Sequence, residues 1–350
     1  MARGANRRVT RAATLRAHRP RLRRARVSNL GGLPARAALR RLLGLWLARA
    51  QAAVTRLGAG RDGEALHDFR VALRRLRTAA RAYGEVAAEL VPDKPRRKLK
   101  RLVAATNATR DAEVFAAWLQ AQRETLPGGA RSGAHWLQAR LARQLRADYA
   151  RLRAELPGAY ARQARKLTRV LETAANAASD SGPSFARLSA VALGPLLEAY
   201  AGARAALADP PSSAQLHALR LAIKRLRYVI EPLAGELPDG KALRRQLTAW
   251  QDLLGEIHDR ARFGELLAEA AAEAGAQKLR RDVLAPLAPG ARRRGADPSS
   301  GLILLAQRLA AENAQRRAKL AQALAGGELA ALQQALETMQ TALLDAVPAA

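Results

Sequence analysis

The sequence predicts an all-α protein, on three observations. Alanine and leucine dominate the chain, and good helix formers occur throughout it. Aromatic residues make up only 4% of the 350 residues, and the β-branched runs that favour strands are scarce. Apolar residues recur at three- and four-residue steps between clusters of Gly and Pro, which is the periodicity of amphipathic helices.

The Gly and Pro clusters divide the chain into helical segments. We expect helices over residues 35–57, 64–90, 94–122, 134–171 (with a kink or break at Pro157), 185–208, 214–234 and 241–275, and one or two more over 302–346. Residues 172–184 end in Ser-Asp-Ser-Gly-Pro-Ser and read as a linker. Residues 276–300 contain several prolines and three consecutive arginines and are expected to be irregular, with no assigned role.

One phrase of the sequence occurs twice, as LHDFRVALRRLR at residues 66–77 and as LHALRLAIKRLR at residues 216–227. Each histidine is followed by arginines three, eight and ten residues later, and Arg74 against Lys224 keeps its charge. Matching residues continue downstream: Arg96-Arg97 with Arg244-Arg245, Asp111 with Asp259, and Phe115 with Phe263. The repeat predicts a tandem duplication of roughly four helices per copy, which favours two helical bundles.

We divide the chain into three parts on this basis. Residues 1–30, interrupted by Pro20, are expected to form a disordered basic arm. Residues 31–178 form the first half and residues 179–350 the second half, each a helical bundle.

The basic residues of the phrase form a stripe beside an apolar seam when the helix is projected at about 100° per residue. The seam comprises Leu66, Phe69, Leu73, Leu76, Ala80 and Tyr83 in the first copy, and Leu216, Leu219, Ile223, Leu226, Ile230 and Leu233 in the second. The stripe comprises His67, Arg70, Arg74, Arg77 and Arg81 in the first copy, and His217, Arg220, Lys224 and Arg227 in the second, where Glu231 ends it. Like charges at these steps destabilise a helix, so two acid-free stripes indicate an anion that neutralises them.

The length of the stripe favours an extended polyanion over a small ligand, because His67 and Arg81 are about 21 Å apart at 1.5 Å per residue. The next helix of each half supplies further candidates: Lys94, Arg97, Lys98 and Arg101 in the first, and Arg244 and Arg245 in the second. The role of the two histidines stays open. Each could pack within the protein or donate an N–H to a phosphate oxygen.

The overall charge also points to a polyanionic partner. The formal net charge is +30, and residues 1–30 hold ten arginines and no acidic residue. The other 50 Lys and Arg still exceed the 30 Asp and Glu, so the rest of the chain is basic as well. Nucleic acid, an acidic membrane surface and a phosphate polymer are the candidate partners.

Several function classes lack their sequence signals. The absence of cysteine excludes disulfides, thiolate metal sites and cysteine nucleophiles, and no apolar stretch reaches the about 18 residues of a membrane-spanning helix. No P-loop, Gly-x-Ser-x-Gly elbow or i, i+4 histidine pair occurs. We therefore expect no enzymatic activity, no cofactor and no metal.

The doubled pattern His-x-x-Arg-x-x-x-(Arg/Lys)-Arg-Leu-Arg, joined to Arg110-Asp111 and His258-Asp259 downstream, resembles the CHAD domain, the conserved histidine α-helical domain. The resemblance covers roughly residues 35–340 and implies two pseudo-symmetric four-helix bundles that face a basic groove and bind inorganic polyphosphate. It implies as binding residues His67, Arg70, Arg74, Arg75 and Arg77, and in the second copy His217, Arg220, Lys224, Arg225 and Arg227.

Two departures from the repeat suggest that the halves bind unequally. Glu231 stands where the first copy has Arg81, and His258 replaces Arg110 before the aspartate. The CHAD resemblance also implies a cytoplasmic protein that associates with polyphosphate granules. The oligomeric state is not predicted.

The alternative function is nucleic-acid binding through the basic arm and the same groove. The chain has few aromatic residues for base stacking, mostly at seam positions, and it lacks the signatures of the common nucleic-acid-binding motifs. Nonspecific binding through the arm stays possible on charge alone.

Overall fold

The structure is a computed structural model that describes residues 29–60, 62–123, 125–128, 131–176, 182–287 and 297–346. Helices are the only extended regular elements in these ranges, which confirms the predicted all-α class. Along the chain they are α2 (Ala35–Ala59), α3 (Ala65–Ala82), α4 (Gly84–Leu90), α5 (Asp93–Ala104), α6 (Asn107–Arg123), α7 (Arg131–Asn176), α8 (Phe185–Ala205), α9 (Ser213–Ile230), α10 (Gly240–Leu284), the 3₁₀ turn η2 (Ala285–Leu287), α11 (Ser299–Ala325) and α12 (Glu328–Asp345). None of the helices in these ranges has the length and apolar character needed to cross a membrane.

Two predicted helices are divided, and two are longer than expected. The helix predicted over residues 64–90 breaks at Gly84, whose φ of 51° suits glycine. The helix predicted over residues 94–122 breaks between α5 and α6, beside the buried Thr106. By contrast, α7 continues through Pro157, and α10 extends well beyond residue 275, where we predicted its end.

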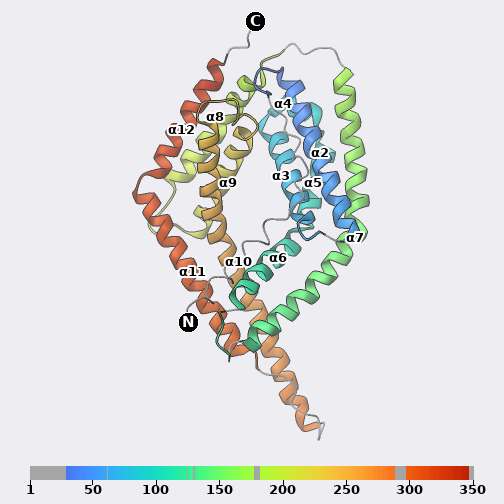
Figure 1. Cartoon of the computed structure of the whole chain (residues 1–350), viewed down its shortest axis with the longest axis vertical. Coiled ribbons are helices and arrows are strands. Elements are labelled where there is room, and N and C mark those ends of the chain that lie inside the picture. Colours follow the sequence, from blue (N-terminus) through green and yellow to red (C-terminus); the bar gives the residue numbers. More distant parts are fainter. Residues whose placement is uncertain are drawn as a thin grey trace, which may run out of the picture.

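The helices form two groups that face each other (Figure 1). On one side lie α2, α3, α5 and α7, on the other α8, α9 and α12, and α6, α10 and α11 gather at one end. Between the groups α3 and α9 pack against each other. The two helices that carry the repeated phrase are therefore neighbours.

Both halves of the chain contribute to each of two buried clusters. The larger cluster includes Leu39 and Phe69 from the first half and Leu193 and Ile223 from the second. The smaller one joins α6 and α7 to α10 and α11, and in it Phe115 and Phe263, which the repeat equates, stack with ring centroids 4.9 Å apart. Hydrophobic contacts thus do not separate residues 31–178 from residues 179–350, and the division into two bundles stays a prediction.

The beginnings of the two halves are also joined. Ala35 N donates to Pro183 O (2.9 Å) and Phe185 N to Leu33 O (2.8 Å), so the starts of α2 and α8 lie side by side. Leu30, which we assigned to the basic arm, is fully buried, and its backbone N–H donates to Glu236 (2.8 Å). The packed chain therefore begins before residue 31.

Three predicted segments fall partly or wholly outside the described residues. They are residues 1–28 of the arm, residues 177–181 of the linker and residues 288–296 of the irregular stretch.

The close approach of α7 and α11 yields a stability prediction. A Cβ added at Gly133 would lie 2.5 Å from Pro298 O and 2.7 Å from Gly301 Cα, both backbone atoms. We expect Gly133→Ala to lower the free energy of unfolding by about 1–3 kcal/mol, because the helices must separate. Urea denaturation monitored by circular dichroism measures this.

Gly44→Ala is the matched control. Gly44 lies inside α2 with no atom within 4 Å of an added Cβ, so alanine should stabilise the helix there by about 0.5–1 kcal/mol. Equal effects of the two substitutions would contradict the tight contact at Gly133.

Candidate functional site

The two basic stripes converge where α3 packs against α9. Arg74 from α3 interacts electrostatically with Arg220 and Arg227 from α9 and with Arg110 from α6. Lys224 interacts with Arg220 and Arg227 on its own helix and with two arginines of α3. We call the group formed by Arg70, Arg74, Arg110, Arg220, Lys224 and Arg227 the central basic cluster.

Burial of the apolar seams determines how these helices are turned. The seam residues of α3, from Leu66 to Leu76, are fully buried, and those of α9, from Leu216 to Ile230, are at most 3% exposed. A capping box starts α9: Gln215 N donates to Ser212 Oγ (3.2 Å), and Ser212 N donates to the Gln215 side chain (2.7 Å). With the seams turned into the core, the neighbouring basic sector of each helix faces the other helix.

Partial burial perturbs the basic groups of the cluster. Burial, reinforced by Arg74, Arg220 and other neighbouring arginines, lowers the pKa of Lys224 to about 7. Burial also lowers the pKa of Arg74, and burial followed by Arg110 and Arg74 lowers the pKa of His67. The positive charges are therefore close enough to disfavour one another.

Three of these cations form no ion pair within the described residues, although Arg220 acts electrostatically on the carboxyl of Asp259. No ion pair to Arg74, Arg220 or Lys224 occurs in the part of the chain that the structure describes. The Nε atoms of Arg74 and Arg220 are buried without a hydrogen-bond partner in these ranges. A partly buried cation without a partner is costly, so this region is suited to an external anion.

Arg70 is engaged within the protein instead. It is 9% exposed, and its Nη1 donates to Val103 O (3.1 Å), Thr106 Oγ1 (2.5 Å) and Asn107 Oδ1 (2.9 Å). Burial lowers its pKa to about 10. Arg70 thus holds the junction between α5 and α6, where the predicted helix breaks.

Arg75 and Arg227 are held by Glu231, the residue that ends the second stripe. Arg75 Nη2 donates to Glu231 Oε1 (2.7 Å) across the α3–α9 contact, and its guanidinium lies 4.6 Å from the centroid of the Trp46 ring. Arg227 lies 3.8 Å from Glu231 and donates to Gln251 (3.0 Å). Both arginines are therefore partly neutralised within the protein.

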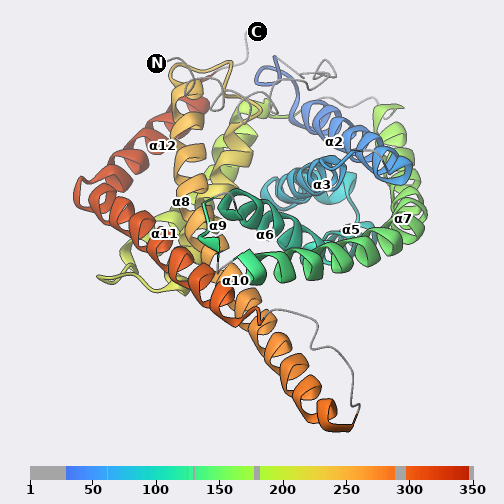
Figure 2. The ribbon, with the colours of Figure 1, turned by 60° about the horizontal axis from the view of Figure 1, so that its bottom comes forward.

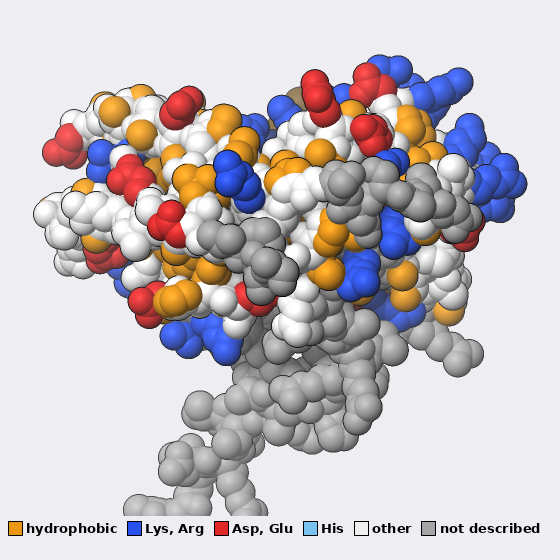
Figure 3. All heavy atoms as spheres, turned by 90° about the horizontal axis from the view of Figure 1, so that it is seen from above, with side chains coloured by type: hydrophobic (Ala, Val, Ile, Leu, Met, Phe, Trp, Pro, Cys, Tyr) orange, Lys and Arg blue, Asp and Glu red, His pale blue; other side chains and the backbone are white. Residues whose placement is uncertain are grey.

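The remaining predicted binding residues lie toward the surface. Arg77 and Arg244 are half-buried, and the exposed ones are Arg81, Lys94, Arg97, Lys98, Arg101, His217, Arg225 and Arg245. Arg97 lies 3.7 Å from Asp93. On the face shown in Figure 3, Lys and Arg side chains gather on the side of α2 and α7 and are sparser on the side of α12. These residues can contribute a surrounding positive field rather than buried contacts.

Histidine and aspartate residues border the cluster on the side of α6 and α10. The rings of His217 and His258 lie 5.2 Å apart. Burial lowers the pKa of His258, with Arg220 as a further cause, and burial raises the pKa of Asp259 against the opposing effect of Arg220. No group of three His, Asp or Glu in the described ranges is arranged to hold a metal ion.

Arg110 is the residue that our list of binding candidates missed. It interacts electrostatically with His67, Arg70 and Arg74 and lies 2.9 Å from Glu113. A signal was present in the sequence, since the repeat aligns Arg110 with His258, and both residues border the same site.

The contacts of Arg70 lead to a prediction that separates folding from binding. We expect Arg70→Ala to lower the free energy of unfolding by about 2–4 kcal/mol, because it leaves buried acceptors without their donor. Arg81→Ala, at an exposed position of the same helix, should change it by less than about 0.5 kcal/mol. Urea denaturation of both variants tests this, and an unchanged stability of Arg70→Ala would show that the junction does not depend on Arg70.

Comparisons with known proteins show the family to which the chain belongs. The family model of the CHAD domain matches residues 37–268. A crystal structure of the CHAD domain from the plant Ricinus communis is similar at a TM-score of 0.59 and 25% identity, over 79% of this chain and 94% of that one. PptA from Streptomyces chartreusis shares the fold at a TM-score of 0.53 and 16% identity, over 88% of this chain and 99% of that one. No curated protein gives a significant match. Since the family match covers more than half of the chain and both copies of the repeated phrase, the chain belongs to the CHAD domain family.

Proposed function

We propose that the protein binds inorganic polyphosphate without turning it over, and that the central basic cluster is the core of the binding site. The observation that carries the proposal is the set of three partly buried cations, Arg74, Arg220 and Lys224, which have no ion-pair partner in the described ranges. They come from both halves of the chain. The arginines whose charges help to lower the pKa of Lys224 also come from both halves.

The chemistry of these groups suits a phosphate chain. Guanidinium groups donate hydrogen bonds in a planar fork that fits phosphate oxygens, and a polymer offers one negative charge after another along its length. The exposed cations on α5 and α10 can then extend the contact beyond the cluster. Each replaced counterion adds to the affinity and to its salt dependence.

The family supports the same ligand and a setting for it. The resemblance noted in the sequence implies polyphosphate binding for CHAD domains, and the family match covers the two basic helices. On this proposal the protein is cytoplasmic and associates with polyphosphate granules. Nucleic acid is the competing ligand, because the arginines of residues 1–28 would attract any polyanion.

Competition between long-chain polyphosphate and duplex DNA at fixed salt tests the proposal. Both the full chain and a chain that starts at Asn29, which retains the buried Leu30, should bind polyphosphate more tightly. Substituting Arg74, Arg220 and Lys224 together by Glu should weaken polyphosphate binding by at least about 100-fold. The slope of log affinity against log salt concentration should also become shallower, by the amount expected for the loss of up to about three phosphate contacts.

A matched control has the same change in charge at exposed positions. Substituting Arg97, Lys98 and Arg101 of α5 by Glu should weaken binding far less, and a triple Gln variant at the cluster guards against unfolding by buried carboxylates. Circular dichroism checks that each variant is folded. Tighter binding of DNA, or equal losses in the two triple variants, would overturn the proposal.

Lys224 gives the binding a predictable pH dependence. With a pKa of about 7, Lys224 gains its charge as the pH falls through neutrality, so polyphosphate affinity should rise from about pH 8.5 to pH 6, by at most about tenfold per unit for one linked proton. His67 should gain its proton only at a lower pH, because burial lowers its pKa. Titrations at several pH values measure the slope.

Lys224→Arg is the control for this slope, because arginine stays protonated throughout the range. The variant should bind with a flatter pH dependence near neutrality and at least as tightly as the unaltered protein at high pH. The same slope in both proteins would assign the effect to another group.

A further inference from the structure

Exposed large apolar side chains are concentrated at one end of the molecule. Within the described residues seven are exposed, and five of these lie at the end of α10, in η2 and at the start of α11: Leu279, Val283, Leu284, Leu287 and Ile303. Single exposed apolar residues are ordinary, but a contiguous group marks an interaction surface.

Four of the five lie on the last part of α10 and on η2, which together leave the body of the protein. We call residues 275–287 the α10 extension. Figure 2 shows it projecting beyond the other helices, and every residue in it is exposed. At positions 279, 283 and 287 its apolar side chains recur every four residues, so they follow one side of the helix.

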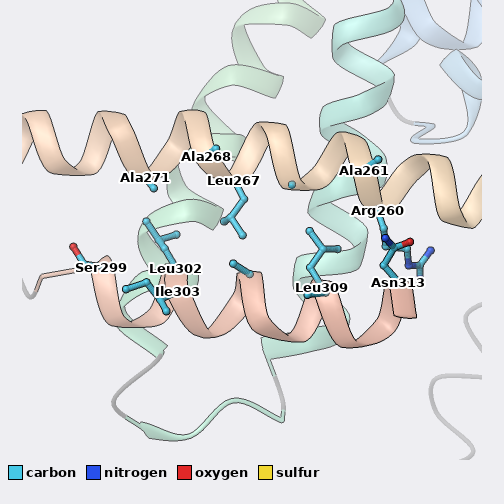
Figure 4. Close-up of a pocket in the computed structure, with 13 residues that line it drawn as sticks. Arg260, Ala261, Leu267, Ala268, Ala271, Ser299, Leu302, Ile303, Leu309 and Asn313 are labelled. Carbon is cyan, nitrogen blue, oxygen red and sulfur yellow. The ribbon is translucent and has the colours of Figure 1, made fainter. Parts of the chain in front are cut away.

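Next to the extension, α10 and α11 enclose an apolar groove with a volume of about 580 Å³. Figure 4 shows side chains of the two helices pointing toward each other across it, with Arg260 and Asn313 at one end and Ser299 at the other. On α10 the lining is made of small residues, including Ala261, Gly264, Ala268 and Ala271. The groove therefore has room for larger side chains from a partner.

The groove and the extension lie on one continuous face of α10. At about 100° per residue, Leu279 falls in the sector that holds Ala261 and Ala268, and Val283 lies about 40° to one side of it, in line with Glu265. The side chains on this face are small along the groove and large along the extension. When two copies of α10 run antiparallel, the large side chains of one copy therefore lie against the small side chains of the other. At 1.5 Å per residue, groove residues 260–271 span about 17 Å and the extension spans about 18 Å, so the two parts have similar lengths.

We propose that this face is a homodimer interface, in which α10 pairs antiparallel with α10 of a second copy. Leu279 and Val283 are four residues apart, as are Ala268 and Gly264, so both large side chains can enter the groove in one register. In that register Leu279 of each copy lies opposite Ala268 of the other, and the twofold axis passes near Glu273.

The charges beside the interface fit the same register. On one flank of this face α10 carries Arg262, which pairs with Glu265 of the same chain, then Glu269, and farther along Arg280. In a symmetric antiparallel pair, residues on the same flank meet, which places Arg280 of one copy between the two carboxylates of the other. Opposite charges at the rim of an interface favour the correct register.

Engineered disulfides test the interface, because the chain contains no cysteine. A full-length chain with Ala268→Cys and Leu279→Cys should form covalent dimers under mild oxidation. These residues are about 16 Å apart on one helix, so they cannot join within one chain. Ala261→Cys with Leu279→Cys is the control. In the proposed register Ala261 lies seven residues away from the position opposite Leu279, so this variant should give few crosslinks.

Sedimentation and light scattering of the unaltered chain should show a dimer at a concentration of about 100 µM, well above a micromolar Kd. Leu279→Glu with Val283→Glu should raise the Kd of the dimer by at least about tenfold. At about 1 µM, where roughly half of the unaltered chain would be dimeric, this variant should therefore be mostly monomeric. Val191→Glu, at an equally exposed apolar position on α8, should leave the dimer intact.

Circular dichroism and polyphosphate affinity should be unchanged in all these variants, because none of them alters the central basic cluster. A monomer at every concentration, or equal crosslinking in the two cysteine pairs, would overturn the interface. A dimer that survives the two Glu substitutions at the extension would place the contact elsewhere.

Discussion

The arrangement of the basic residues depends on the burial of two apolar seams. A fully buried Leu or Ile contributes about 1.5–3 kcal/mol, and α3 and α9 each bury several, such as Leu73 and Ile223. A like-charge pair on a helix costs only about 0.2–0.5 kcal/mol. The core therefore decides how both helices are turned, and the cations beside the seams are carried into mutual proximity.

The same constraint divides one sequence motif into two kinds of residue. Two of the arginines find acceptors within the protein: Arg70 binds the α5–α6 junction, and Arg75 binds Glu231 and Trp46. Arg74 and Arg220 are half-buried, like Arg75, but form no ion pair in the described ranges. A repeated motif can thus stabilise the fold and bind a ligand with neighbouring residues.

The sequence was sufficient to predict the helical class, the two seams and the family, because each rests on local periodicity or on residue identity. Local periodicity was not sufficient to predict that the stripes meet, since the contact of α3 with α9 joins residues about 150 positions apart. Only the family resemblance implied a shared basic groove. The break at Thr106 was missed for a similar reason: Arg70, remote in the sequence, supplies its hydrogen bond. Glu231 was read as the end of a stripe, and only the structure shows it pairing with Arg75 of the other half.

The one basic position at which the two copies of the repeated phrase differ acquires a physical meaning in this setting. Lys224 lies among Arg70, Arg74, Arg220 and Arg227, and burial together with these charges lowers its pKa to about 7, close to neutral pH. An arginine there would keep its charge, because guanidinium does not deprotonate in proteins. On the proposed function, a lysine that loses its proton relieves the repulsion in the free protein and regains its charge when the anion binds. The exchange of Arg74 for Lys224 between the repeats is conservative in sequence, but it gives the cluster one cation whose charge can change near neutral pH.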